Sequence, residues 1–220
     1  MIGSATPATT PRSTTETTET TETPETTETT ETTVTTAPIS IRPAQPQDSA
    51  AIVGLIRELA DFEQLLHLVE VTPEQLAQQL FGPRPAAECV VVQGGPGAQG
   101  PQGTVVDEQE IVAFALFFHN FSTFLGRPGL YLEDLYVRPA HRGRGIGRAL
   151  LTHLAGLARQ RGCGRFEWSV LDWNANAIAF YEKLGATVMP DWRICRVTGP
   201  GLQALAGEGF RAGSDAEPPV

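Results

Sequence analysis

The chain has 220 residues and a formal net charge of −9. The first 38 residues carry six Glu and one Arg, so they contribute −5 and the rest of the chain contributes −4. This acidic balance disfavours nucleic-acid binding, which needs a basic face. The three cysteines (Cys89, Cys163 and Cys195) have neither a disulfide-framework spacing nor a zinc-ligand spacing, so reduced thiols, a cytoplasmic location and no metal are expected.

The chain divides by composition into three parts. Residues 5–37 are almost entirely Thr, Glu and Pro, a composition that cannot bury enough apolar surface to offset chain entropy, so residues 1–38 are expected to be a disordered extension. They contain no hydrophobic run that would serve as a signal peptide or a membrane span. Residues 39–205 have the size of one domain with a full core, and residues 206–220 are expected to fray.

The domain begins with a short strand at residues 39–42 and a helix for which Asp48 is the expected N-terminal cap. The apolar residues of this helix recur at helical spacing: Ile52, Leu55, Ile56, Leu59 and Phe62. Thr72 and Gln75 flank a Pro in the pattern of a capping box, which predicts a second helix to Phe81.

Strands are predicted at residues 89–93 and 111–118, joined by a Gly- and Pro-rich hairpin loop at 94–103. A further strand is predicted at residues 130–137. Its aliphatic residues slip by one position from the two-residue period: Leu130, Leu132, Leu135 and Val137. Such a slip predicts a β-bulge in the middle of the strand.

A glycine-rich turn follows this strand and opens directly into an amphipathic helix. Glycines let the backbone approach a ligand closely, and the unpaired N–H groups of a helix start favour an anion. Arg142, Arg144 and Arg148 add positive charge at the same place. The segment therefore predicts a site for a pyrophosphate-containing molecule, although the turn alone is also compatible with an ordinary strand–turn–helix junction.

The remaining elements alternate in type. A strand is predicted at residues 165–171, a helix at 174–184 that ends at Gly185, and a closing strand at 193–198. This order predicts a mixed α/β sheet with helices on both faces.

Two motifs resemble landmarks of one family. Arg142-x-x-Gly145-x-Gly147 resembles the turn of GNAT N-acetyltransferases, and the segment from Asn174 through Tyr181 to Gly185 resembles their second landmark. Residues 41–44, 131–134 and 192–193 are most similar to the diamine (spermidine/spermine) and thialysine acetyltransferases. The resemblance covers residues 39–205 and implies the single-domain GNAT acyl-CoA N-acyltransferase fold, with a central β-bulge that splays two parallel strands.

The resemblance also implies acetyl-CoA as cosubstrate. Its pantetheine arm would lie in the gap between the splayed strands, and the turn would hold its pyrophosphate. The implied contacts are Leu135, Tyr136, Val137, Arg142, Gly143, Arg144, Gly145, Ile146, Gly147, Arg148, Asn174 and Tyr181. Without the resemblance, Asn174 is equally explained as the N-terminal cap of a helix, and Arg144 as a solvent-exposed side chain.

Acetyl transfer to an amine needs a proton acceptor for the amine and a proton donor for the departing thiolate. By resemblance, Glu133 is the base, acting through water, and Tyr181 is the acid, since a phenol with a pKa near 10 suits protonation of a thiolate. The alternatives are a buried acid bonded to backbone or Arg for Glu133, and a core aromatic for Tyr181.

The acceptor contacts that the resemblance implies are Glu63, Glu133, Asp134 and Trp192. The sequence is also compatible with a solvent-exposed Glu63 and with a Trp192 that only packs under the sheet. Polyamine-specific relatives carry an acidic-Pro-Trp stretch before the central strand, whereas this chain has residues 122–127 without a carboxylate and with Arg127. A shorter acceptor fits at least as well as a long polyamine.

These residues together predict an acetyl-CoA-dependent N-acetyltransferase that acts on a primary amine of a small cationic molecule by direct attack in a ternary complex. Acetylation of a protein lysine or N-terminus, and a catalytically idle CoA-binding protein, are the alternatives. The resemblance implies a homodimer, and neither a nucleic acid nor a membrane is expected as a partner.

Overall fold

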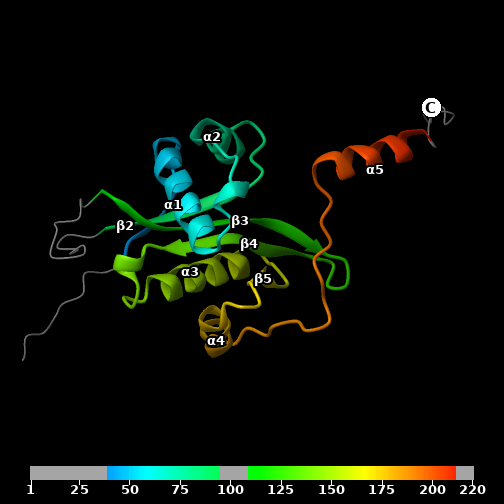
Figure 1. The fold of residues 1–220 in the computed structure, drawn as a ribbon. Coiled ribbons are helices and arrows are strands. Elements are labelled where there is room, and N and C mark those ends of the chain that lie inside the picture. Colours follow the sequence, from blue (N-terminus) through cyan, green and yellow to red (C-terminus); the bar gives the residue numbers. More distant parts are fainter. Residues whose placement is uncertain (1–38, 95–108, 212–220) are drawn as a thin grey trace, which may run out of the picture. The chain divides into compact units, whose positions relative to one another are not determined.

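A computed structural model describes residues 39–94 and 109–211 of the chain. A five-stranded sheet in the order β1-β2-β3-β4-β5 forms its centre (Figure 1). The strands are Ile41–Pro43, Glu88–Gln93, Ile111–Ser122, Arg127–Val137 and Phe166–Trp168. The first three pairings are antiparallel and the pairing of β4 with β5 is parallel, so the predicted mixed α/β sheet is confirmed. The predicted extension at 1–38 and most of the predicted hairpin loop lie outside the described residues.

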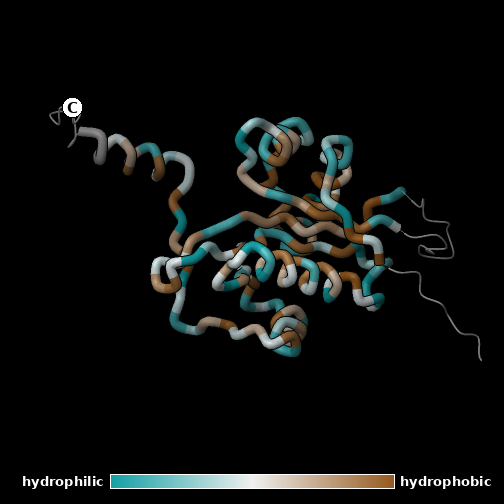
Figure 2. The backbone as a smooth tube through the Cα atoms, turned by 180° about the vertical axis from the view of Figure 1, so that it is seen from behind, coloured by the Kyte–Doolittle hydropathy of each residue, from teal (hydrophilic) through white to brown (hydrophobic). Residues whose placement is uncertain are grey.

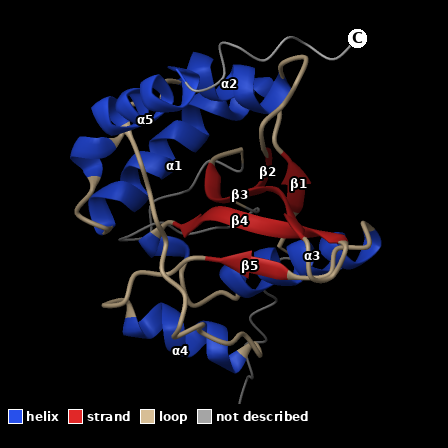
Figure 3. Cartoon of the chain, turned by 90° about the vertical axis from the view of Figure 1, so that its right-hand side faces the viewer, coloured by secondary structure: helices blue, strands red, loops and turns tan. Residues whose placement is uncertain are grey.

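Helices cover both faces of this sheet, as the edge-on view in Figure 3 shows. The helices on the two faces are α1 (Ser49–Phe62), α2 (Pro73–Phe81), α3 (Ile146–Gln160) and α4 (Ala175–Lys183). A further helix, α5 (Gly199–Arg211), keeps its side chains Leu202 and Leu205 exposed. One core lies between the sheet and the helices α1 and α2, around Ile52, Leu55 and Phe114. The other lies between the sheet and α3, around Leu150 and Leu154. Figure 2 shows the hydrophobic residues concentrated along the strands that separate these two cores.

The helix starts follow from local hydrogen bonds. At α2 the predicted capping box is confirmed, since Thr72 Oγ1 accepts from Gln75 N at 3.3 Å and Gln75 Oε1 accepts from Thr72 N at 2.9 Å. At α1 the prediction was partly wrong. Asp48 occupies the N-cap position, but its side chain makes no capping hydrogen bond.

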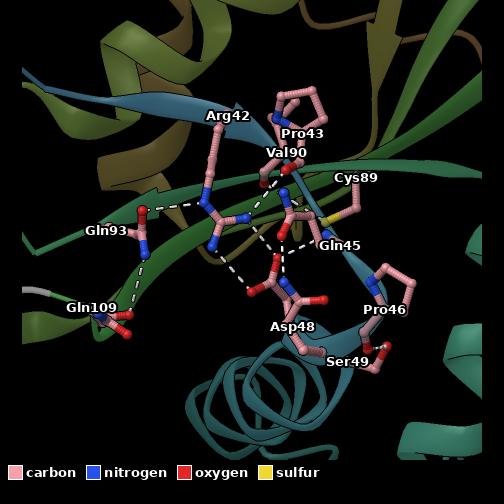
Figure 4. Close-up of polar contacts among 11 residues, drawn as sticks. Arg42, Pro43, Gln45, Pro46, Asp48, Ser49, Cys89, Val90, Gln93 and Gln109 are labelled. Carbon is pink, nitrogen blue, oxygen red and sulfur yellow. Dashed lines mark hydrogen bonds and ion pairs between the residues drawn. The ribbon is translucent and has the colours of Figure 1, made fainter.

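The carboxylate of Asp48 instead accepts hydrogen bonds from Arg42 Nη1 and Nη2, at 2.6 and 3.0 Å, and from Gln45 N at 2.7 Å (Figure 4). Arg42 also donates from Nε to Gln93 Oε1 at 3.1 Å. One guanidinium thereby ties β1, β2 and the start of α1 together.

The C-terminal part differs most from the sequence-based expectation. β5 is limited to three residues, and the closing strand predicted at 193–198 is wrong, because that segment forms no strand in the structure. Its apolar side chains are exposed, with Ile194 at 69% and Val197 at 50%. α5 continues to Arg211, past the domain boundary predicted at residue 205. Within the described ranges, no helix is both long and apolar enough to cross a membrane.

Candidate active site

The predicted β-bulge is present in β4 and falls on Glu133. Leu116 of β3 faces Asp134, and the next residue, Phe117, faces Leu132. Glu133 is therefore the extra residue of the bulge, without a partner on β3, and its side chain is exposed. The bulge explains how two adjacent carboxylates occur within an otherwise apolar strand.

A gap opens between β4 and β5 at the level of the bulge. The parallel pairing of these strands covers three residues and ends at Leu132 and Trp168. Past this point β4 runs on for five residues to Val137 with its pairing on the β3 side. The residues predicted to line a pantetheine arm, Leu135, Tyr136 and Val137, lie on this stretch, whose β5-side edge is left to hydrogen-bond a ligand.

The glycine turn lies beyond the end of β4 and begins α3. Gly143 and Gly145 have φ angles of 76° and 79°, a region that residues with a Cβ rarely adopt, and Gly145 is the N-cap of α3. A Cβ built at either glycine would meet nothing within 4 Å, so the space in front of the helix start is open. The turn thus fits a pyrophosphate, since the N–H groups of a helix start and open space occur in a segment that carries three arginines.

The first two of these arginines are held in different ways. Arg142 donates from Nε to Val137 O at 2.9 Å, and its Cζ lies 5.4 Å from the ring centroid of Phe62 and 5.6 Å from that of Tyr136. Arg144 Nη1 lies 3.2 Å from Nδ1 of the buried His141. Burial, and after it the charge of Arg144, lowers the pKa of His141, so a neutral ring accepts this hydrogen bond.

Two adjacent carboxylates lie at the bulge, and the charge of a third, Glu63, acts on one of them. Burial, and after it the charges of Glu133 and Glu63, raises the pKa of Asp134 from 3.8 to about 6. Glu63 is the C-cap of α1, and burial raises its pKa as well. The negative charges of Glu63 and Glu133 thus act on Asp134, and their surplus over nearby positive charge makes the surroundings of Asp134 suited to a cation.

Tyr181 joins this cluster from α4. Its ring lies 5.1 Å from that of Trp168 and 5.5 Å from that of Phe180, measured between centroids. Burial, and after it the charge of Glu63, raises its pKa above the ordinary 10.0, so the phenol holds its proton at neutral pH. The charge of Glu63 thus acts on Tyr181 of α4 as well as on Asp134 of β4.

Two further predicted contacts lie at the start of α4 and between α4 and α5: Asn174 and Trp192. The Asn174 side chain caps α4, accepting from Ala177 N at 3.2 Å, which is the alternative reading of this residue. Trp192 is 71% exposed, and no ring contact joins it to the described residues of the cluster. The roles predicted for these two side chains toward ligands stay predictions.

Sequence reasoning missed the partnership of Phe62 and Trp173, whose ring centroids lie 5.8 Å apart. Phe62 was read as part of an apolar helix face, and Trp173 merely precedes the motif asparagine. Both rings remain largely exposed, at 45% and 57%. Neither residue lies near the other or near the glycine turn in the sequence, so no sequence signal pointed to this contact.

Comparison with known proteins agrees with this geometry. The model of the acetyltransferase (GNAT) family matches residues 70–186. The L-ornithine N5-acetyltransferase of Arabidopsis thaliana is 37% identical over 197 residues, which cover 75% of this chain and 86% of that protein. The thialysine N-epsilon-acetyltransferase of Sus scrofa is 37% identical over 175 residues, covering 78% and 99%.

The chain belongs to the GNAT acetyltransferase family. A solved structure of an integron cassette protein from V. cholerae shares the fold, with a TM-score of 0.60 and 24% identity over 76% of this chain and 97% of that one. The predicted family, fold class and enzyme class are thereby confirmed. GNAT enzymes use acetyl-CoA as cosubstrate, and the described part of the chain holds no cluster of three or more metal-ligating side chains.

Proposed function

We propose that this GNAT enzyme acetylates a primary amine of a small cationic molecule, namely a diamine or a lysine-like amino acid. The observation that carries the proposal is the bulge of β4, which leaves Glu133 exposed beside the half-buried Asp134, while the charge of Glu63 acts on both Asp134 and Tyr181. An uncompensated cluster of carboxylates is costly unless a cation joins it. In a diamine or a diamino acid, one protonated amino group supplies that cation, and the other loses its proton and is acetylated.

The relatives support a short acceptor. One is named for L-ornithine and the other for thialysine, and each is similar to this chain over most of its own length. The turn between β3 and β4 supplies no carboxylate, and it ends in the exposed Arg127. A positive charge at that position disfavours the far end of a long polyamine.

In this proposal the amine attacks the thioester directly, so that a C–N bond forms and the C–S bond breaks. Asp134 and Glu63 hold the ammonium end of the acceptor. Glu133, exposed on the bulge, takes the proton of the attacking amine through water. Tyr181 gives its proton to the departing thiolate, and the open edge of β4 with the turn from Arg142 to Arg148 holds the cosubstrate.

Three further expectations from the sequence stay predictions. They are a homodimer, a cytoplasmic location, and the contact of Trp192 with the acceptor.

A thiol-release assay with acetyl-CoA tests the proposal against putrescine, spermidine, spermine, thialysine, L-ornithine, lysine and a lysine peptide. A blank without amine removes the signal of the exposed Cys195. We expect the short diamines and diamino acids to be turned over best and Asp134→Asn to weaken this turnover. Turnover with the peptide alone, or none at all while acetyl-CoA binds, would contradict the proposal.

A further inference from the structure

One face of the sheet extends from the bulge to β5. Leu116 and Phe118 lie two residues apart on β3, so their side chains are on the same face. Asp134 of β4 lies opposite Leu116, and Tyr131 lies opposite Phe118, with ring centroids 5.2 Å apart. On its other side Tyr131 pairs with Glu167 of β5. Asp134, Tyr131 and Glu167 therefore form a row on one face, with about 7–10 Å of β4 between the first two.

Arg165, which immediately precedes β5, is held on this face. It lies two residues before Glu167, and its Nε forms an ion pair with Glu167 Oε2 at 2.8 Å. The same oxygen accepts a hydrogen bond from Asn120 Nδ2 of β3 at 3.0 Å. Gly129 of β4 leaves the necessary room, because a Cβ at this position would overlap Asn120 Oδ1 and lie 3.1 Å from Arg165 Cγ. Residues of three neighbouring strands thus fix the guanidinium.

The guanidinium of Arg165 has unused donors. Its Nε is buried, and the contact with Glu167 lacks the alignment of a hydrogen bond. Neither Nη1 nor Nη2 of Arg165 donates a hydrogen bond to a described residue.

Arg161 shows the contrasting case on the other face of the sheet, where its guanidinium lies over the ring of Phe117. Both of its terminal nitrogens donate to the carboxylate of Glu88, so they are occupied within the protein. Buried donors ordinarily have a partner, and a fixed guanidinium with free terminal nitrogens is the group that binds a carboxylate in a bidentate way. Arg165 is therefore prepared for a carboxylate that the described part of the chain does not supply.

We propose that Arg165 is a specificity-determining residue that binds the α-carboxylate of a diamino acid, while the side-chain amine of that amino acid is acetylated beside the bulge. This inference rests on the proposed function and narrows its acceptor class. The stretch of β4 between Asp134 and Tyr131 is comparable in length to an extended diamino acid, so one molecule reaches from the bulge toward Arg165. A plain diamine has no carboxylate and leaves the donors of Arg165 without a partner, which weakens its binding.

The first test changes the acceptor and leaves the protein unaltered. Putrescine is L-ornithine without its carboxyl group, and L-ornithinamide keeps the α-amine but replaces the negative charge by a neutral amide. We expect kcat/KM for L-ornithine to exceed that for each of these two compounds by about tenfold or more. Calorimetry of the same compounds with protein saturated with CoA gives the comparison without turnover. Equal values for L-ornithine and L-ornithinamide would overturn the inference.

The second test compares Arg165→Gln with Arg161→Gln, a matched control because each arginine pairs with a glutamate and the two side chains are similarly exposed, at 37% and 31%. We expect Arg165→Gln to reduce the preference for L-ornithine over putrescine by about tenfold or more, Arg165→Lys to retain part of it, and Arg161→Gln to keep it.

The outcomes separate this inference from the proposed function. An unchanged preference in Arg165→Gln, or an equal loss of preference in Arg161→Gln, would overturn the role of Arg165 while the enzyme still acetylates short amines. Absence of turnover for L-ornithine, thialysine and putrescine alike in the wild type would instead refute the proposed function.

Discussion

Tyr181 meets Trp168 edge-on, with ring centroids 5.1 Å apart and ring planes at 65°. Trp168 is the last residue of β5 that pairs with β4, so this contact fixes the phenol where the two strands part. The position of the proposed acid thereby depends on the packing of its ring, and its hydroxyl has no hydrogen bond within the described part of the chain.

Replacing Tyr181 by Phe keeps this ring contact and removes the proton donor. We expect kcat to fall by about a hundredfold or more, as for the loss of a general acid, while CoA binding changes by less than about threefold. Steady-state kinetics and calorimetry measure the two effects. An unchanged kcat would remove Tyr181 from the proton transfer.

The two acids of the bulge are expected to differ in role. Glu133→Gln removes the proposed base and should lower kcat by about a hundredfold with little change in the acceptor KM. Asp134→Asn removes a contact to the bound cation and should raise the acceptor KM by about tenfold or more. The same assay on both variants separates the roles, and the opposite pattern would exchange them.

The raised pKa of Asp134 also affects stability. Since the folded chain binds this proton up to a pH of about 6, whereas the ordinary pKa is 3.8, the free energy of unfolding falls as the pH rises between these values and is level above them. Asn at this position does not ionise. Asp134→Asn should therefore be more stable than the wild type by on the order of 2–3 kcal/mol at neutral pH, and the difference should vanish below about pH 4.

Urea unfolding of both proteins across this range measures the difference. A variant that is less stable than the wild type at neutral pH would mean that the charged carboxylate is compensated by a partner.

The ion pair of Arg42 and Asp48 has the opposite pH dependence. Hydrogen bonds from Arg42 hold the pKa of the buried Asp48 below its ordinary value of 3.8. The resulting stabilisation is present above about pH 4 and is lost as the pH falls through the lowered pKa. At neutral pH we expect Asp48→Asn to lower the free energy of unfolding by about 2 kcal/mol.

Asp61→Asn is the matched control, because Asp61 is exposed on the same helix. Its effect should stay within about 0.5 kcal/mol. Equal effects of the two substitutions in urea unfolding would show that the Arg42 pair contributes nothing of its own.

Features that depend on interactions between neighbouring residues could be predicted from the sequence. Three predicted features depend on only a few neighbouring residues, and each is found in the structure. They are the capping box at Thr72, the turn at Gly145 and the β-bulge at Glu133, which the shift in the two-residue period of the strand predicted. A strand needs a partner as well as a suitable composition. Residues 193–198 have no partner strand among the described residues and stay exposed, so β-propensity alone misled the prediction.

Contacts between distant segments could not be predicted. The carboxylate of Asp48 suits a helix cap, but the nearby guanidinium of Arg42 competes for it with two charge-assisted hydrogen bonds. The meeting of Phe62 with Trp173 depends on how α1 and α4 lie on opposite faces of the sheet. No spacing in the sequence records that relationship.

The most direct test of the proposed function lets the acceptor classes compete for acetylation. The full chain is incubated with acetyl-CoA and an equimolar mixture of L-ornithine, thialysine, putrescine, spermine and a lysine peptide, and mass spectrometry identifies the acetylated products. We predict that the singly acetylated short amines dominate in the wild type, and that Tyr181→Phe forms the same products far more slowly. Acetylation confined to the peptide, or no acetylated product at all, would contradict a small cationic amine as the acceptor.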